Sequence, residues 1–166
     1  ADGQHPDFTP TGIAAIDERL DGGMRGGELI VIGARPSMGK SALALTIAAN
    51  VAADSKPVGI FSMEMPRRQV YGRLLSMKSK VHLTRIKRPE RLGDAGWSDV
   101  NRAVEKLVKQ YIAVNDQSGL TITQVRTKTR ALLRRFGKLG LIVVDYLGLM
   151  NGTDPKIPRA YQLAEV

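Results

Sequence analysis

Apolar and polar residues alternate along this chain in a way that predicts strands and helices in turn. Four mainly apolar stretches have the composition of strands in a covered sheet, and they span residues 29–34, 57–64, 111–116 and 139–146. Apolar residues at helical spacing predict helices over residues 13–20, 40–53, 65–79, 96–110 and 121–137. Strands that alternate with helices favour a mostly parallel sheet with helices on both faces, which is an α/β fold.

Local signals set the ends of several predicted elements. Thr121 and Gln124 have the spacing of a capping box at the start of the last helix, and Gly137 is its expected stop. Pro66 is expected in the first turn of the helix over residues 65–79. Residues 1–10 are polar, contain two prolines and lack periodicity, which indicates a linker. The folded domain is therefore expected to cover residues 11–166.

Composition limits the class of protein. A length of 166 residues, with 43% hydrophobic and 25% charged residues, suits one globular domain with a core. No apolar run approaches the ~20 residues that span a bilayer, and residues 1–10 do not resemble a signal peptide. The sequence has no cysteine, which excludes disulfides and thiolate metal sites. These features agree with a cytoplasmic protein that has no membrane partner.

Basic residues are clustered, and the net charge is +9. Residues 67–91 hold nine Lys or Arg against one acid, and residues 126–138 hold six and no acid. Such clusters suit a polyanion such as nucleic acid, although a solvated surface explains them equally well. Arg126, Arg130 and Arg134 form one stripe on their helix, which can face DNA, a neighbouring subunit or solvent.

The turn between the first predicted strand and the next helix carries a phosphate-binding pattern. Residues 34–41 read ARPSMGKS, which fits A-x-x-x-x-G-K-S with Ala at the position where Gly is commonest. Gly39 permits close approach of the backbone to an anion, Lys40 adds a full positive charge, and the Ser41 hydroxyl can ligate Mg²⁺. The alternative is an ordinary strand–helix turn with a solvated lysine. The candidate nucleotide-binding residues are Ala34, Arg35, Pro36, Ser37, Met38, Gly39, Lys40 and Ser41.

Carboxylates end the other predicted strands. Asp145 closes the run LIVVD, where the acidic partner of a nucleotide-bound magnesium ion normally lies. Glu64 ends the strand over residues 57–64 and is a candidate general base for water. Either residue can instead be a plain strand-end acid. An Asp at the position of Asp116 more often caps the next turn than takes part in catalysis, so Asp116 is left out of the catalytic set. The candidate catalytic residues are Lys40, Glu64 and Asp145, and the candidate Mg²⁺ ligands are Ser41 and Asp145.

Residues 11–45, 56–66 and 114–150 resemble, in order and spacing, the ATPase domain of the DnaB-type replicative helicases. The resemblance covers residues 9–165. The motif ARPSMGKS is close to diagnostic of that family within the RecA-like class. FSMEM looks like the family's strand with the catalytic glutamate, here Glu64, and LIVVDYLGLM looks like its magnesium-aspartate strand, here Asp145.

The resemblance implies a RecA-like P-loop NTPase core that uses ATP and Mg²⁺. It also implies a homohexameric ring around single-stranded DNA that moves 5′ to 3′ and unwinds duplex, with primase and a helicase loader as partners. In such a ring the segment 151–161 can look toward the pore, which makes Lys156 and Arg159 candidate phosphate contacts. A flexible loop is the alternative for that segment.

Two departures qualify the resemblance. Gly148 stands where the family usually carries Gln. The sequence also stops before the family's fifth core strand, arginine finger and central DNA-binding loop, so we expect a fold that is incomplete at its C-terminal side. The isolated chain is then expected to be a weak ATPase. A RecA-like recombinase, or another nucleic-acid-binding protein switched by ATP without unwinding, is the alternative function.

Overall fold

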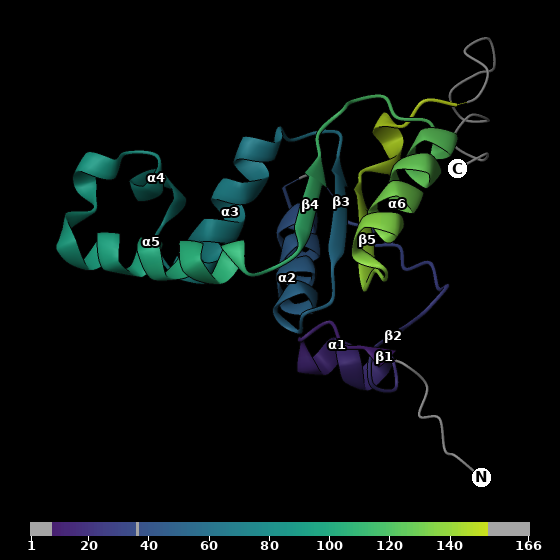
Figure 1. Cartoon of the computed structure of the whole chain (residues 1–166), viewed down its shortest axis with the longest axis horizontal. Coiled ribbons are helices and arrows are strands. Elements are labelled where there is room, and N and C mark those ends of the chain that lie inside the picture. Colours follow the sequence, from purple (N-terminus) through teal and green to yellow (C-terminus); the bar gives the residue numbers. More distant parts are fainter. Residues whose placement is uncertain (1–7, 36, 153–166) are drawn as a thin grey trace.

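The centre of the fold is a sheet of three parallel strands (Figure 1). The computed structural model describes residues 8–35 and 37–152. The strand β3 (Val58–Ser62) lies between β4 (Ile112–Asn115) and β5 (Leu141–Asp145). The register places Ser62 beside Asp145, so these two strands end at the same edge of the sheet. A separate antiparallel ribbon joins β1 (Phe8–Thr9) and β2 (Met24–Arg25).

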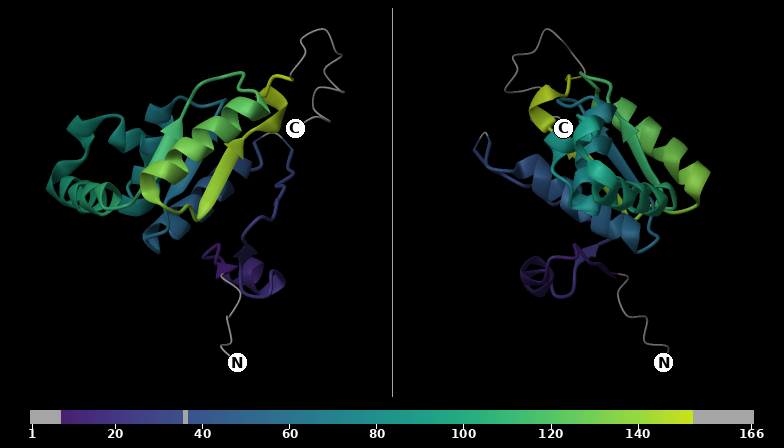
Figure 2. Two further views of the ribbon diagram at one scale, coloured as in Figure 1. Left: turned by 45° about the vertical axis from the view of Figure 1, so that its right-hand side comes forward. Right: turned by 90° about the vertical axis from the view of Figure 1, so that its left-hand side faces the viewer.

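Helices cover both faces of the central sheet, as the sequence predicts (Figure 2). The helices α2 (Lys40–Ala53) and α3 (Arg67–Ser79) pack on one face, and α6 (Ile122–Phe136) packs on the other. The remaining helices are short or peripheral, and they are α1 (Ala14–Arg19), α4 (Leu83–Ile86), α5 (Gly93–Val108) and the 3₁₀ turns η1 (Pro89–Arg91) and η2 (Leu147–Leu149).

Alternate residues of β3 supply the two halves of the core. Val58 and Ile60 pack with α2 and α3, whereas Phe61 packs with residues at the start of α6. The helix α2 buries Leu45, Ile47, Ala48, Val51 and Ala52, as expected for a helix that is apolar nearly all round. Gly59 lets α6 lie close to the sheet, because a Cβ there would come within 2.7 Å of Ile142 and 2.9 Å of Leu132.

A smaller unit of α4, η1 and α5 extends from the sheet beyond α3 (Figure 1). Its apolar centre consists of Val81, Leu92 and Val100, with Leu75 and Ile86 packed against them. Because Leu75 belongs to α3, this third cluster attaches the unit to the main domain.

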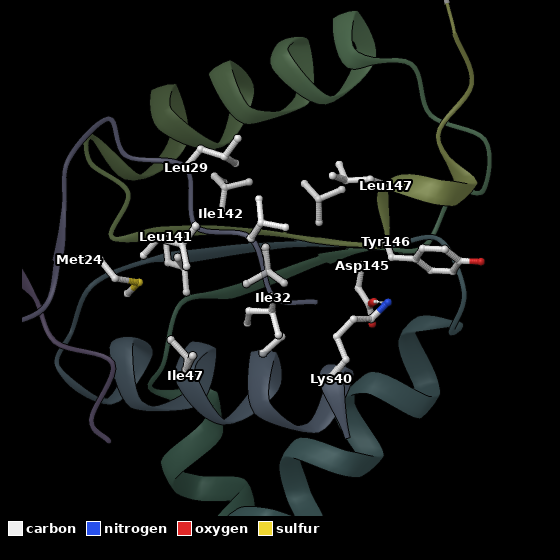
Figure 3. Close-up of a pocket in the computed structure, with 15 residues that line it drawn as sticks. Met24, Leu29, Ile32, Lys40, Ile47, Leu141, Ile142, Asp145, Tyr146 and Leu147 are labelled. Carbon is white, nitrogen blue, oxygen red and sulfur yellow. Dashed lines mark ion pairs between the residues drawn. The ribbon is translucent and has the colours of Figure 1, made fainter. Parts of the chain in front are cut away.

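The prediction of a strand over residues 29–34 is wrong for this structure. These residues form no strand, and the side chains of Leu29 and Val31 are 84% and 69% exposed. A hollow of about 320 Å³ separates residues 29–32 from β5, with apolar side chains on both sides (Figure 3). An aliphatic run becomes a strand by pairing its backbone with a neighbour, and the described residues provide no strand in that position.

Other predicted boundaries agree closely with the structure. The capping box of Thr121 and Gln124 is formed, and Gly137 ends α6 with a φ of 76°. Pro66 is the N-cap of α3 and thus lies one residue before its first turn. Phe8 and Thr9, which we expected in the linker, pair with β2 instead because the glycine-rich turn brings Met24 and Arg25 beside them. No helix among the described residues is long and apolar enough to cross a membrane.

Candidate nucleotide-binding site

The loop before α2 forms a sharp turn that leaves the start of the helix open to an anion. Gly39 adopts a left-handed conformation with a φ of 88°, and Ser37 does so with a φ of 64°. Among the described residues, no side chain caps the N-terminus of α2. The backbone N–H groups of the first turn therefore retain their capacity to bind phosphate, and the helix dipole favours a negative charge there.

Lys40 and Asp145 meet at this end of the sheet (Figure 3). The Lys40 Nζ atom lies 3.5 Å from Oδ1 of Asp145 and 4.1 Å from the centre of the Tyr146 ring. The Asp145 side chain is only 9% exposed, whereas that of Lys40 is 30% exposed. Burial of a carboxylate is costly without a partner, and the ammonium group supplies one. The backbone oxygen of Asp145 also accepts a hydrogen bond of 2.8 Å from the Met63 N–H.

Glu64 follows the neighbouring strand at the same edge. It lies two residues beyond Ser62, which is the register partner of Asp145. The buried Ser62 hydroxyl donates a 2.8 Å hydrogen bond to the Met65 carbonyl and thereby holds the turn that carries Glu64. Glu64 itself is exposed and does not belong to the residues that line the hollow beside β5. The sequence analysis missed this role of Ser62. The available signal was the position of a small residue with a hydroxyl group at the end of the strand.

Asp116 has a structural partner. Its Oδ2 accepts a 2.9 Å hydrogen bond from the Arg67 N–H at the start of α3, and its Oδ1 lies 3.1 Å from Nη2 of the same residue. The backbone hydrogen bond, aided by the guanidinium group, holds the pKa of Asp116 below its usual value. This pair joins the end of β4 to the start of α3. Asp116 therefore has a structural role, but it does not cap the next turn as we expected, since Asn115 accepts the hydrogen bond from the Gln117 N–H there.

The other predicted site residues differ in their surroundings. Ser41 is half-buried in the first turn of α2 beside Lys40. Exposed positions in the loop are Ala34, Arg35, Ser37 and Met38, and exposed positions on α6 are Arg126, Arg130 and Arg134. Pro36, Lys156 and Arg159 lie outside the described residues.

The side chains present suit Mg²⁺ bound together with a nucleotide. Within the described part of the chain, no three His, Cys, Asp or Glu side chains gather into a self-sufficient metal site. Magnesium prefers oxygen ligands, keeps several waters and is commonly held by one or two protein groups plus phosphates. The Ser41 hydroxyl and the Asp145 carboxylate are oxygen donors of that kind.

Tyr146 is a neighbour of Lys40 that sequence reasoning missed. Its ring faces the ammonium group, and this position requires a small residue at 148. A Cβ atom on Gly148 would come within 2.5 Å of Cε2 of the Tyr146 ring. The only sequence signal was the departure of Gly148 from the pattern of the family that the chain resembles.

Comparison with known proteins gives consistent matches. The model of the family described as "DnaB-like helicase C terminal domain" matches residues 9–166. The chain is 37% identical over 158 residues to replicative DNA helicase DnaB of Pasteurella multocida, which covers 94% of this chain and 34% of that protein. It is 35% identical over 159 residues to replicative DNA helicase DnaC of Bacillus subtilis. That match covers 95% of this chain and 34% of the relative. The chain thus spans about a third of the length of these curated relatives.

Solved structures agree on the fold. One of them, titled as an ATPase domain, has a TM-score of 0.90 at 27% identity, covering 99% of this chain and 58% of that one. Another structure is titled "The Structure Of A DnaB-Like Replicative Helicase And Its Interactions With Primase". It has a TM-score of 0.87 at 26% identity, and the match covers 94% of this chain and 38% of that one. These likenesses confirm the expected RecA-like α/β architecture.

Proposed function

The chain belongs to the family of DnaB-like helicase C-terminal domains, and we propose from this premise that it is the ATP-driven motor domain of a replicative DNA helicase. In the proposed activity, ATP hydrolysis drives 5′ to 3′ translocation on single-stranded DNA and unwinding of duplex by a homohexameric ring. The observation that carries the proposal is the 3.5 Å contact between Lys40 of the phosphate-binding loop and Asp145 of the adjacent strand end.

In this mechanism the first turn of α2 binds the phosphates of ATP. Its backbone N–H groups contact phosphate oxygens, and Lys40 exchanges its contact with Asp145 for the β- and γ-phosphates. The Asp145 carboxylate and the Ser41 hydroxyl would hold Mg²⁺ as oxygen donors once Lys40 contacts the phosphates. Mg²⁺, when bound, neutralises negative charge on the phosphates.

Glu64 acts on the attacking water. Its exposed carboxylate, two residues beyond the strand partner of Asp145, can accept a proton from water at the γ-phosphate. Such a base typically contributes about 10²- to 10⁴-fold to the rate. An arginine from a neighbouring subunit would contribute a further ~10³- to 10⁵-fold, and a single copy of this chain cannot supply that contact to itself.

DNA and protein partners complete the proposal. Arg126, Arg130 and Arg134 on α6, with Lys156 and Arg159, are the candidate contacts to single-stranded DNA. One similar solved structure is titled as a DnaB-like replicative helicase with its interactions with primase. We extend a primase partner to the longer protein, together with a helicase loader, and place its action in the cytoplasm.

A forked-duplex assay tests the function. The longer protein that contains this domain is expected to unwind a fork with a 5′ single-stranded arm when ATP and Mg²⁺ are present. Its Lys40→Ala variant is expected to lose unwinding because the phosphates lose their cation. Strand exchange without unwinding would contradict the proposal and favour a recombinase.

A matched pair of substitutions tests the general base. Glu64→Gln is expected to lower ATP turnover at least 100-fold while nucleotide affinity stays within a few-fold, because the amide cannot accept the proton. Glu105→Gln, an exposed substitution on α5, is the control and should leave turnover unchanged. Unchanged turnover in Glu64→Gln would remove Glu64 from the mechanism.

A further inference from the structure

The surface formed by α3, α4 and η1 has two neighbouring hollows that share Lys87. The first has a volume of about 590 Å³ and includes Arg68 and Arg73 in its lining, and the second has a volume of about 350 Å³ and includes Arg88 and Arg91. We call these two hollows, with the five cations named here, the basic trough. The nucleotide site uses none of these residues.

The positive charges of the basic trough have no acidic partner among the described residues. Ion pairs elsewhere in the described residues, such as those of Lys40 with Asp145, Arg67 with Asp116 and Arg102 with Asp99, do not involve these cations. Residues 67–91 contain a single acid, Glu90, and it lines neither hollow. With Arg85, which also lines the second hollow, six like charges are held together without a counter-charge. They create a positive potential that favours an anionic ligand.

The trough rests on fixed structure. Leu83 and Ile86 of α4 are half-buried in its lining, and Ile86 packs on the cluster of Val81, Leu92 and Val100. The guanidinium of Arg85 donates hydrogen bonds of 3.2 and 3.3 Å to the carbonyls of Arg91 and Leu92, which hold η1 against α4. The cations therefore project from a folded support and not from a loose tail.

We propose that the basic trough binds the sugar–phosphate backbone of a nucleic-acid strand. Two hollows in series with a shared lysine suit successive phosphates on one chain, and arginine fits phosphate oxygens in a bidentate manner. No aromatic side chain lines either hollow, so the contact reads no base and is independent of sequence. A second copy of this chain is a poor occupant because each copy carries a net charge of +9.

This site is additional to the DNA contacts of the proposed motor. It lies on α3, α4 and η1, whereas those candidates lie on α6 and after β5. Binding in the trough needs neither ATP nor unwinding activity. Failure of the motor proposal would therefore leave the trough unaffected, and the reverse also holds.

The test uses fluorescence anisotropy of a labelled 20-nucleotide oligo(dT) without nucleotide, from 50 to 200 mM salt. The triple variant Arg73→Gln, Lys87→Gln, Arg88→Gln is expected to bind at least tenfold more weakly at 50 mM salt. The slope of log affinity against log salt should fall by about 2, since each lost phosphate contact removes about 0.7 for a single strand.

A control variant with the same change in net charge distinguishes binding in the trough from general attraction of DNA to a positively charged protein. Arg19→Gln, Lys106→Gln, Lys109→Gln removes three exposed cations outside the trough and should change affinity less than threefold. Equal losses in both triple variants would overturn the proposal, as would loss of all binding in Arg126→Gln, Arg130→Gln, Arg134→Gln alone. Competition by poly-glutamate as effective as that by oligo(dT) of equal charge would also overturn it, in favour of an acidic protein partner.

A milder variant keeps the test decisive if the triple variant does not fold. Lys87 and Arg88 are both exposed, so Lys87→Gln, Arg88→Gln should leave the circular dichroism spectrum and melting temperature unchanged. This pair should lower the salt slope by about 1.4. An unchanged slope in the folded double variant would refute the proposal.

Discussion

At the scale of single residues, Tyr146 and Gly148 determine the surroundings of the Lys40 ammonium group. The ammonium lies over the Tyr146 ring, 4.1 Å from its centre, and Gly148 leaves the space in which the ring sits. Such cation–π contacts are worth about 0.5–1 kcal/mol at partly exposed sites. Gly148, although it has no side chain, is therefore part of the surroundings of Lys40.

A double-mutant cycle tests this relation. Gly148→Ala is expected to lower the free energy of unfolding by about 0.5–1 kcal/mol because the new Cβ displaces the Tyr146 ring. In a Tyr146→Leu background the same substitution should cost clearly less, because the ring that it displaces is gone. Chemical denaturation of the four proteins gives the coupling energy.

The control for this cycle is Gly26→Ala. A Cβ at Gly26 meets no atom within 4 Å, so this variant shares only the effect of alanine on the unfolded chain. A cost for Gly148→Ala equal to that of Gly26→Ala, or additive costs in the cycle, would show that the ring does not depend on Gly148.

At the scale of elements, the Arg67–Asp116 contact fixes the start of α3 against the end of β4. The pKa of Asp116 lies below its usual value, chiefly through the hydrogen bond from the Arg67 N–H. A lowered pKa in the folded state means that the contact stabilises the fold above the unfolded pKa of about 3.9. That stabilisation is lost as the pH falls through the lower, folded value.

Unfolding by urea between pH 2.5 and 7 should show this dependence. The difference in free energy of unfolding between the native chain and Asp116→Asn is expected to be constant above about pH 5 and to shrink below about pH 4. Arg67→Gln keeps the backbone hydrogen bond and should retain most of the pH dependence. A difference that is independent of pH would show that the carboxylate does not favour its ionised form in the fold.

The elements also show what can be predicted from the sequence. Capping residues such as Thr121 and Gln124 act locally, so their pattern sufficed, and aliphatic runs ending in Asp145 and Glu64 identified one edge of the sheet. Residues 29–34 were predicted wrongly because a strand also requires a neighbour, which the local pattern does not reveal. The contact of Tyr146 with Lys40 depends on the fold and on the absence of a side chain at Gly148. Neither produces a periodic pattern in the sequence.

Two leucines of equal size test the assignment of residues 29–34. Leu29 is 84% exposed, whereas Leu74 on α3 is 1% exposed. Leu29→Ala is therefore expected to change the free energy of unfolding by no more than about 0.5 kcal/mol, and Leu74→Ala to lower it by about 2–5 kcal/mol. A cost above about 2 kcal/mol for Leu29→Ala would show that this segment is packed as a strand in solution.

At the scale of the whole molecule, the groups of the nucleotide site separate into those that bind and those that complete catalysis. In the proposed mechanism, the chain itself contributes the open helix terminus, Lys40, Ser41, Asp145 and Glu64. The side chains that face the hollow beside β5 are mainly apolar, apart from the contact of Lys40 with Asp145. Lys40 is the cation that pairs with Asp145 there. In the proposed mechanism, the second cation for the transition state therefore comes from a neighbouring subunit.

A verified monomer of this chain is expected to bind ATP weakly and to hydrolyse it roughly 10³-fold or more slowly than an assembly that supplies an arginine from a neighbour. Sedimentation velocity and ATP turnover measured on the same sample, with Lys40→Ala as the blank, link the rate to the oligomeric state. Because binding alone needs only groups of one chain, saturable uptake of a fluorescent ATP analogue should persist in the monomer and disappear in Lys40→Ala. Rapid turnover by a sample that sediments as a monomer would contradict the dependence on a neighbouring subunit, since a single copy would then stabilise the transition state by itself.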